Sequence, residues 1–168
     1  VRLGRTTVAT LRRTLGAEHP ATQLAIDIVA DVYSDSGDLE GALALQTEQV
    51  ATSKRVHGSE HYVTLSSMDG LATTHGRMNN YHLALPLYVE ALEGRRRTLR
   101  DVRANSVAGH EAAFGPRHKE LLKNICSLAS TYENLCEYEL ALPLIEEALE
   151  GMRRLLGSKH RDTLVAAG

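Results

Sequence analysis

The stretch Leu15-Gly16-Ala17-Glu18-His19-Pro20 decides the fold, because the chain repeats this short phrase four times. The phrase ends at a histidine, followed by proline in the first copy only, and its later copies are His57-Gly58-Ser59-Glu60-His61, Phe114-Gly115-Pro116-Arg117-His118 and Leu156-Gly157-Ser158-Lys159-His160. Successive final histidines are 42, 57 and 42 residues apart. A period of this size predicts an array of stacked helical repeats, with 15 extra residues in the middle unit.

Alignment of the copies on the histidine predicts two helices in each unit. Apolar residues recur at i, i+3, i+4 and i+7, the spacing of one buried helix face. In the first helix the matching positions are Ile26, Val29, Ala30 and Tyr33; Met68, Leu71, Ala72 and His75; and Ile125, Leu128, Ala129 and Tyr132. In the second helix they are Leu39, Ala42, Leu43 and Val50; Tyr81, Ala84, Leu85 and Leu92; and Tyr138, Ala141, Leu142 and Leu149.

Short polar segments between the two helices predict tight turns. They are 35–38, 77–80 and 134–137, and they include Gly37, Asn79 and Asn80, residue types that tolerate the left-handed conformation at a helix end. The histidine phrase is expected to end the second helix and to lead into the next unit, with Pro20 and Pro116 suited to a helix start. Pro86 and Pro143 are likewise expected to mark the start of a second helix.

These boundaries predict one array over residues 1–168. Residues 1–16 form the end of a preceding repeat, 17–58 repeat 1, 59–115 repeat 2 with an insertion at 101–115, 116–157 repeat 3, and 158–168 the start of a further repeat. We expect the chain to be a fragment of a longer protein or to lie against a partner, because cut ends would expose apolar helix faces.

Composition fits a globular helical chain and excludes several classes. The 168 residues are 43% hydrophobic and 24% charged, and 19 basic against 21 acidic residues argue against a surface shaped as a whole for nucleic acid or anionic membrane. No apolar stretch is long enough for a transmembrane helix. Cys126 and Cys136 lie outside any metal or redox spacing and fit a reducing compartment, so we expect an intracellular, cytoplasmic protein. The first residue is valine, so organelle targeting stays open.

The repeated positions resemble the tetratricopeptide repeat, and the 42-residue period is similar to the repeats of kinesin light chain. The clearest matches are residues 81–92 and 138–149, each followed by the Gly-x-x-His phrase. The resemblance implies an all-α, right-handed superhelical solenoid of antiparallel helix pairs, whose concave wall binds peptides. In kinesin light chain that wall carries paired asparagines. Here the matching pairs are Asp27-Ile28, Asp69-Gly70 and Cys126-Ser127, which argues against cargo binding of the kinesin type.

An acidic groove is one candidate partner-binding site. Asp27, Asp31 and Asp35 are spaced four apart on one helix and therefore share a face, and Asp69 of the next copy adds to the same wall, with Thr73 and Arg77 further along. Such a wall would accept a Lys- or Arg-rich segment; the alternative is an ordinary solvated face.

The insertion is a second candidate, because five arginines within nine residues lead into it: Arg95, Arg96, Arg97, Arg100 and Arg103. The helix is expected to continue by about two turns before Gly109 breaks it. A basic helix could be a solvated structural element, or it could contact an acidic protein, nucleic acid or lipid. Nucleic acid is disfavoured because no aromatic residue lies among the arginines.

Catalysis, metal binding and cofactor binding are not expected. Histidines of neighbouring repeats should lie roughly 10 Å apart, too far to share one ion, and the chain has neither a phosphate-binding loop nor a nucleophile motif. The sequence therefore predicts a non-catalytic scaffold that binds a partner protein through the groove or the basic insertion. The alternative is a structural linker subunit of a larger assembly.

Overall fold

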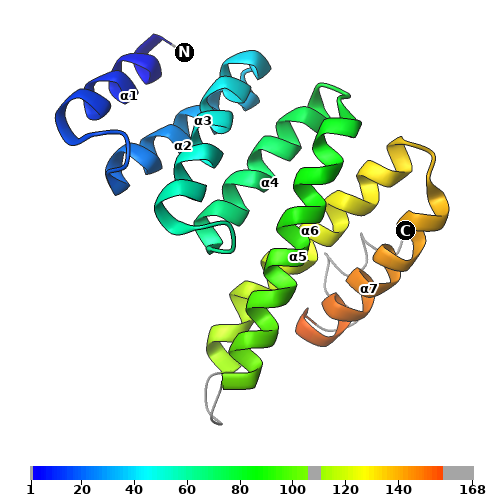
Figure 1. The fold of residues 1–168 in the computed structure, drawn as a ribbon. Coiled ribbons are helices and arrows are strands. Elements are labelled where there is room, and N and C mark those ends of the chain that lie inside the picture. Colours follow the sequence, from blue (N-terminus) through cyan, green and yellow to red (C-terminus); the bar gives the residue numbers. More distant parts are fainter. Residues whose placement is uncertain (1, 106–110, 157–168) are drawn as a thin grey trace. The chain divides into compact units, whose positions relative to one another are not determined.

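The computed structural model describes residues 2–105 and 111–156, and the side chains of residues 4–101 and 118–155 (Figure 1). Seven α-helices account for nearly all of these residues, which confirms the all-α prediction for the described part of the chain. They are α1 (Arg2–Leu15), α2 (Pro20–Asp35), α3 (Leu39–His57), α4 (Tyr62–Arg77), α5 (Tyr81–Asn105), α6 (Glu111–Asn134) and α7 (Tyr138–Leu156). None of the described helices is both long enough and apolar enough to cross a membrane.

The helices form two compact units, Val1–Leu87 and Tyr88–Gly168. In the first unit, α2 packs against α1 and α3, and α3 packs against α4; in the second unit, α6 packs against α7. Consecutive helices of a pair run in opposite directions (Figure 1).

The repeat period predicted most of the core. Among the predicted residues of the second helices, five are only half-buried: Leu39, Leu43, Tyr81, Leu85 and Leu149. The buried residues Val8, Leu65, Tyr88 and Leu122 were not predicted. Ile26, Ala30 and Tyr33 of α2 are at most 2% exposed, and Tyr33 packs with Val8 and Ala42 in one cluster. The equivalent residues of α4 and α6 are also buried, except that His75 and Tyr132 are half-buried. Two predicted core residues of α7 are wrong: Tyr138 is 63% exposed and Leu142 is 58% exposed, because no described helix follows α7 to cover that face.

The three turns within the pairs share one geometry. The third residue of each turn has positive φ: 84° at Gly37, 60° at Asn79 and 61° at Cys136. The amide of the following residue then donates to a carbonyl five residues earlier, as Asp38 N does to Tyr33 O at 2.9 Å. Asn80 to His75 and Glu137 to Tyr132 repeat this bond at 2.9 Å. It satisfies a carbonyl at the helix end, as in a Schellman turn.

The histidine phrase forms the predicted junction in its first two copies. Gly16 and Gly58 adopt φ of 91° and 87°, and His19 and His61 then cap α2 and α4. The Nδ1 of His19 accepts from Ala21 N at 3.2 Å, and that of His61 accepts from Val63 N at 3.3 Å. An imidazole nitrogen thus satisfies a free amide of the first turn.

The third copy corrects this prediction. Helix α6 begins at Glu111, so Pro116, His118 and the expected boundary at 115/116 lie inside a helix. Glu111, Ala112 and Ala113 are strong helix formers, which accounts for the earlier start. Of the expected insertion, residues 101–105 belong to α5 and 111–115 to α6. Residues 106–110, including Gly109, and residues 157–168 with the fourth phrase lie outside the described part.

The positions of Pro86 and Pro143 are a second correction. Each is the sixth residue of its helix, α5 or α7, and so lies beyond the first turn. The four amides that lack an intrahelical partner are those of the first turn, so each proline removes a hydrogen bond that the helix would otherwise make.

Candidate functional site

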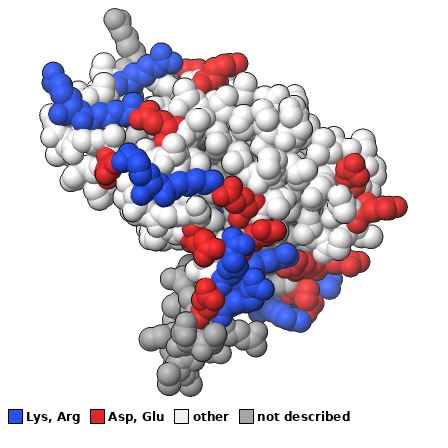
Figure 2. All heavy atoms as spheres, viewed as in Figure 1, with Lys and Arg blue, Asp and Glu red and all other residues white. Residues whose placement is uncertain are grey.

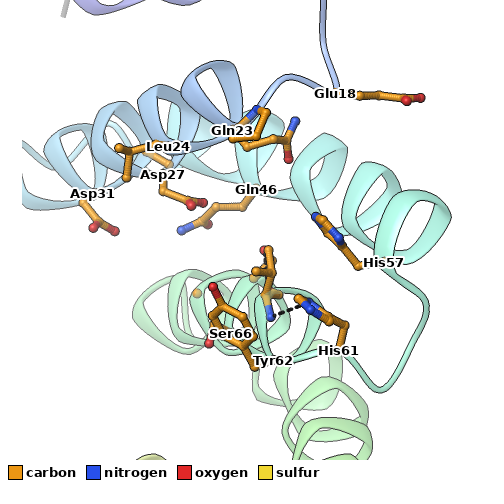
Figure 3. A pocket seen from close by; sticks show the side chains of 15 residues that line it. Glu18, Gln23, Leu24, Asp27, Asp31, Gln46, His57, His61, Tyr62 and Ser66 are labelled. Atoms are coloured by element: carbon orange, nitrogen blue, oxygen red, sulfur yellow. Dashed lines mark hydrogen bonds between the residues drawn. The ribbon is translucent and has the colours of Figure 1, made fainter.

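A cleft of about 590 Å³ opens between α2 and α4, with α3 at its base (Figure 3). All its residues belong to the first unit. They come from the start and middle of α2, from α3, and from the first half of α4. The lining residues are Glu18, Pro20, Gln23, Leu24, Asp27, Ala30, Asp31, Gln46, His57, His61, Tyr62, Val63, Ser66, Ser67 and Gly70.

Two carboxylates on α2 give the cleft its charge. Asp27 and Asp31 are one helical turn apart and therefore point to the same side. Burial raises the pKa of the Asp27 carboxyl from 3.8 to about 6, the negative charge of Asp31 contributes to this rise, and a hydrogen bond with Gln49 opposes it. Asp27 still reaches solvent, so its carboxylate faces both the cleft and the protein interior.

The base of the cleft is polar. Gln46 lines it and is 8% exposed, whereas Gln49 is 1% exposed, does not line the cleft and forms a hydrogen bond with Asp27. Neither side-chain Oε1 has a hydrogen-bond partner among the described residues. Gln49 Nε2 lies 3.5 Å from the backbone oxygen of Gln23. Figure 3 shows Asp27 of α2 and Gln46 of α3 extending toward each other across the cleft. A carboxylate and a buried amide thus meet where a helix pair usually places apolar side chains.

Aromatic side chains line the side of the cleft that is formed by the end of α3 and the start of α4. The imidazoles of His57 and His61 stack with centroids 4.7 Å apart, and the ring of Tyr62 follows at 4.8 Å from His61. His61 is held by its cap bond to Val63 N, drawn as the dashed line in Figure 3. No group of three His, Cys, Asp or Glu side chains within the described residues is arranged to hold a metal ion.

The predicted acidic wall is divided in the structure. Asp27 and Asp31 line the cleft, whereas Asp35 does not; its Oδ1 lies 3.7 Å from Nη1 of Arg77, which also donates to Ser34 Oγ. Asp69 and Thr73 of α4 are likewise absent from the lining. Thr73 Oγ1 donates to the backbone oxygen of Asp69 at 2.8 Å, along the helix.

The predicted basic segment lies on α5, and two of its five arginines pair with glutamates. Arg95 is 7% exposed. Arg96 donates to Glu147 of α7 at 2.5 Å, and Arg97 lies 3.7 Å from Glu93. Arg100 is exposed, and the side chain of Arg103 lies outside the described part. On the face drawn in Figure 2, basic side chains lie beside acidic ones.

Sequence reasoning missed the base and the aromatic side of the cleft. Comparison of the copies held the signal, because the base of copy one is polar where the other copies are apolar. Gln46 corresponds to Tyr88 and Ile145, and Gln49 corresponds to Ala91 and Ala148. The stacking of His57 on His61 has no such signal, since it depends on how Gly58 turns the chain between them.

Known proteins share this fold. The structure aligns with the nearly identical TPR-like repeats of a putative kinesin light chain from Podosopora anserina, with a TM-score of 0.74 and 22% identity over 98% of this chain and 71% of that one. A variant of that protein gives a TM-score of 0.76 with the same identity and coverage. BtubC from P. vanneervenii gives 0.72 and 14% identity over 95% of this chain and 57% of its own length.

Sequence comparison assigns the family. No curated protein is similar enough to match. The tetratricopeptide repeat family matches residues 22–97 and again residues 125–162, which together cover more than half of the chain. The second match includes residues of the fourth histidine phrase. The chain therefore belongs to the tetratricopeptide repeat family, and its fold is that of the kinesin-light-chain type of helical-repeat array.

Proposed function

We propose that this chain is a non-catalytic scaffold that binds a basic segment of a partner protein in the cleft between α2 and α4. Tetratricopeptide repeats generally mediate interactions between proteins. The observation that carries the proposal is a cleft of about 590 Å³ with two carboxylates on one wall and a polar base. Complementary charge of this kind directs a partner and fixes its register.

A peptide-display selection on the purified chain tests the proposal. We expect the selected peptides to be rich in Lys and Arg, and we expect the double variant Asp27→Lys, Asp31→Lys to weaken their binding by about tenfold or more. The matched control is Glu120→Lys, Glu146→Lys, which makes the same charge change at two exposed positions outside the cleft. Selection of neutral or acidic peptides, or equal binding by both double variants, would refute the proposal.

A structural linker is the second candidate function, and the exposed apolar face of α7 favours it. Tyr138 and Leu142 are one helical turn apart on the same face and are 63% and 58% exposed, and exposed apolar side chains that lie together are typical of a protein contact. If the chain is a linker, Leu142→Lys blocks its assembly and the charge reversal on α2 does not.

A contact through the arginines of α5 has less support, because Arg96 and Arg97 already pair with glutamates.

A further inference from the structure

Two carboxylates and one amide line the same part of the cleft. Asp27 and Asp31 project from α2, and Gln46 projects from α3 below them (Figure 3). The Gln46 side chain is more than nine-tenths buried, and its Oε1 has no partner among the described residues. An unpaired buried acceptor is unfavourable by about 1–3 kcal/mol, and this oxygen is closed to solvent, so a ligand removes the cost only if the amide turns its oxygen toward the cleft.

The Gln46 amide is held close to the opposite helix. A Cβ built on Gly70 of α4 would lie 3.4 Å from Gln46 Nε2, an ordinary van der Waals contact, so the amide faces Gly70 across a gap about as wide as one methyl group. A half-turn about the last side-chain torsion exchanges Nε2 and Oε1, so the oxygen can also face the cleft. Gln46 is therefore positioned to accept a hydrogen bond from a group that enters between α2 and α4.

The aromatic side of the cleft restricts the kind of cation. Tyr62 lines the cleft and is 72% exposed, and its ring follows the stacked pair of His57 and His61. A guanidinium is planar, stacks on aromatic faces and carries five N–H donors in a fixed arrangement. An ammonium has only three donors and is more strongly hydrated. Three acceptors beside an aromatic ring therefore match arginine better than lysine.

We propose that this cleft is an arginine subsite, in which Asp27, Asp31 and Gln46 receive the guanidinium of a partner side chain that stacks beside Tyr62. The inference rests on the proposed function and adds the identity of the recognised side chain. Leu24, 60% exposed beside the carboxylates, is placed to contact the aliphatic part of the same side chain.

Three peptides that differ at one position test the subsite. The probes are acetyl-Ala-Gly-Xaa-Gly-Ala-amide with arginine, lysine or citrulline at Xaa, titrated into the isotope-labelled chain and followed by NMR. Citrulline has the shape of arginine without its charge. We expect the arginine peptide to shift the signals of Asp27, Tyr62 and the Gln46 side-chain amide, to bind about fivefold more tightly than lysine, and to bind at least about tenfold more tightly than citrulline.

Matched variants separate direct contact from general attraction. Asp27→Asn and Gln46→Leu should each lower the affinity for the arginine peptide by about tenfold, which is the loss typical of a charge-assisted hydrogen bond. Asp35→Asn removes the same charge from the same helix outside the cleft and should change binding by less than about twofold. Circular dichroism checks that each variant is folded.

The two proposals fail in different ways. The arginine subsite is overturned if the citrulline and arginine peptides bind the cleft equally, if the lysine peptide binds more tightly, or if no signal shifts up to ~10 mM arginine peptide. In each of these cases the display-selected peptides still test whether the cleft binds a basic segment. Selected peptides that bind without moving any cleft signal overturn the proposed function itself.

Discussion

Replacing Asp27 by asparagine should stabilise the folded protein at neutral pH. Burial and the charge of Asp31 raise the pKa of the Asp27 carboxyl from 3.8 to about 6, so the ionised form is disfavoured in the folded state. A shift of this size corresponds to roughly 3 kcal/mol at 1.36 kcal/mol per pKa unit. By its accessible surface Asp27 is an exposed residue, so solvent screens most of this penalty, and we expect the variant to gain at most about 1 kcal/mol.

The pH dependence identifies the cause. At and below pH 4 the carboxyl is largely protonated in the folded chain and becomes protonated in the unfolded chain, so the penalty disappears; it grows as pH rises toward the folded pKa and is complete above about pH 7. The variant's advantage should therefore be largest at pH 7 and nearly absent at pH 4. Glu18, His57, His61 and Tyr62 also line the cleft and are common to both proteins, whereas the repulsion between Asp31 and Asp27 is part of the difference, because the variant removes it.

Urea unfolding followed by far-ultraviolet circular dichroism, at pH 4, 5, 6 and 7, measures the difference. Asp35→Asn is the control; Asp35 forms an exposed ion pair with Arg77, so its replacement should change the free energy of unfolding by less than about 0.5 kcal/mol. An Asp27→Asn variant that is no more stable than the parent at pH 7 refutes the desolvation of Asp27. An advantage that is constant with pH attributes the effect to packing instead.

Four further substitutions test the packing, the turns and a helix cap by the same unfolding assay. Gly41→Ala should lower the free energy of unfolding by about 1–3 kcal/mol, because the new Cβ would lie 2.6 Å from Tyr33 Cδ2. Gly76→Ala should raise it by about 0.5–1 kcal/mol, because no atom lies within 4 Å of the new Cβ. Equal effects of the two substitutions would contradict the packing. Cys136→Gly should raise the free energy of unfolding by about 1 kcal/mol, because glycine adopts a φ of 61° without strain. A lower free energy of unfolding would show that the thiol contributes to stability. His61→Ala should cost about 1 kcal/mol through the lost cap on Val63 N, with an unchanged midpoint as the contrary result.

The helix pairs were predictable from sequence because their determinants are local and recur. Ile26, Met68 and Ile125 occupy one position of three copies, and all are at most 1% exposed. Gly37 and Asn79 allowed the first two turns to be predicted, because both residue types tolerate a positive φ. Cys136 adopts the same positive φ although cysteine does not favour it. There the bonds that the following residues make across the turn outweigh local preference.

The helix starts were wrongly predicted where one local sequence signal was outweighed by another. The phrase at His118 matches the junction pattern, but the alanines before it extend α6 past that point. Pro86 and Pro143 signal a helix start, yet Tyr81 and Tyr138 already begin their helices five residues earlier. The cleft was only half predictable, since the spacing of Asp27 and Asp31 is local but the approach of Gln46 depends on how three helices pack.

The repeats of this chain provide an internal comparison that bears on function. Three glutamines of copy one, Gln23, Gln46 and Gln49, are at most 9% exposed, and their counterparts are Leu65, Tyr88 and Ala91 in copy two and Leu122, Ile145 and Ala148 in copy three. The apolar sets form the same helix pair, so the fold does not require glutamine there. The amide oxygens of Gln46 and Gln49 lack partners, and they lie near a carboxylate whose hydration is reduced, so both features lower stability. A cationic ligand relieves both costs at once, which is why we place the binding site where copy one meets α4 rather than along the whole array.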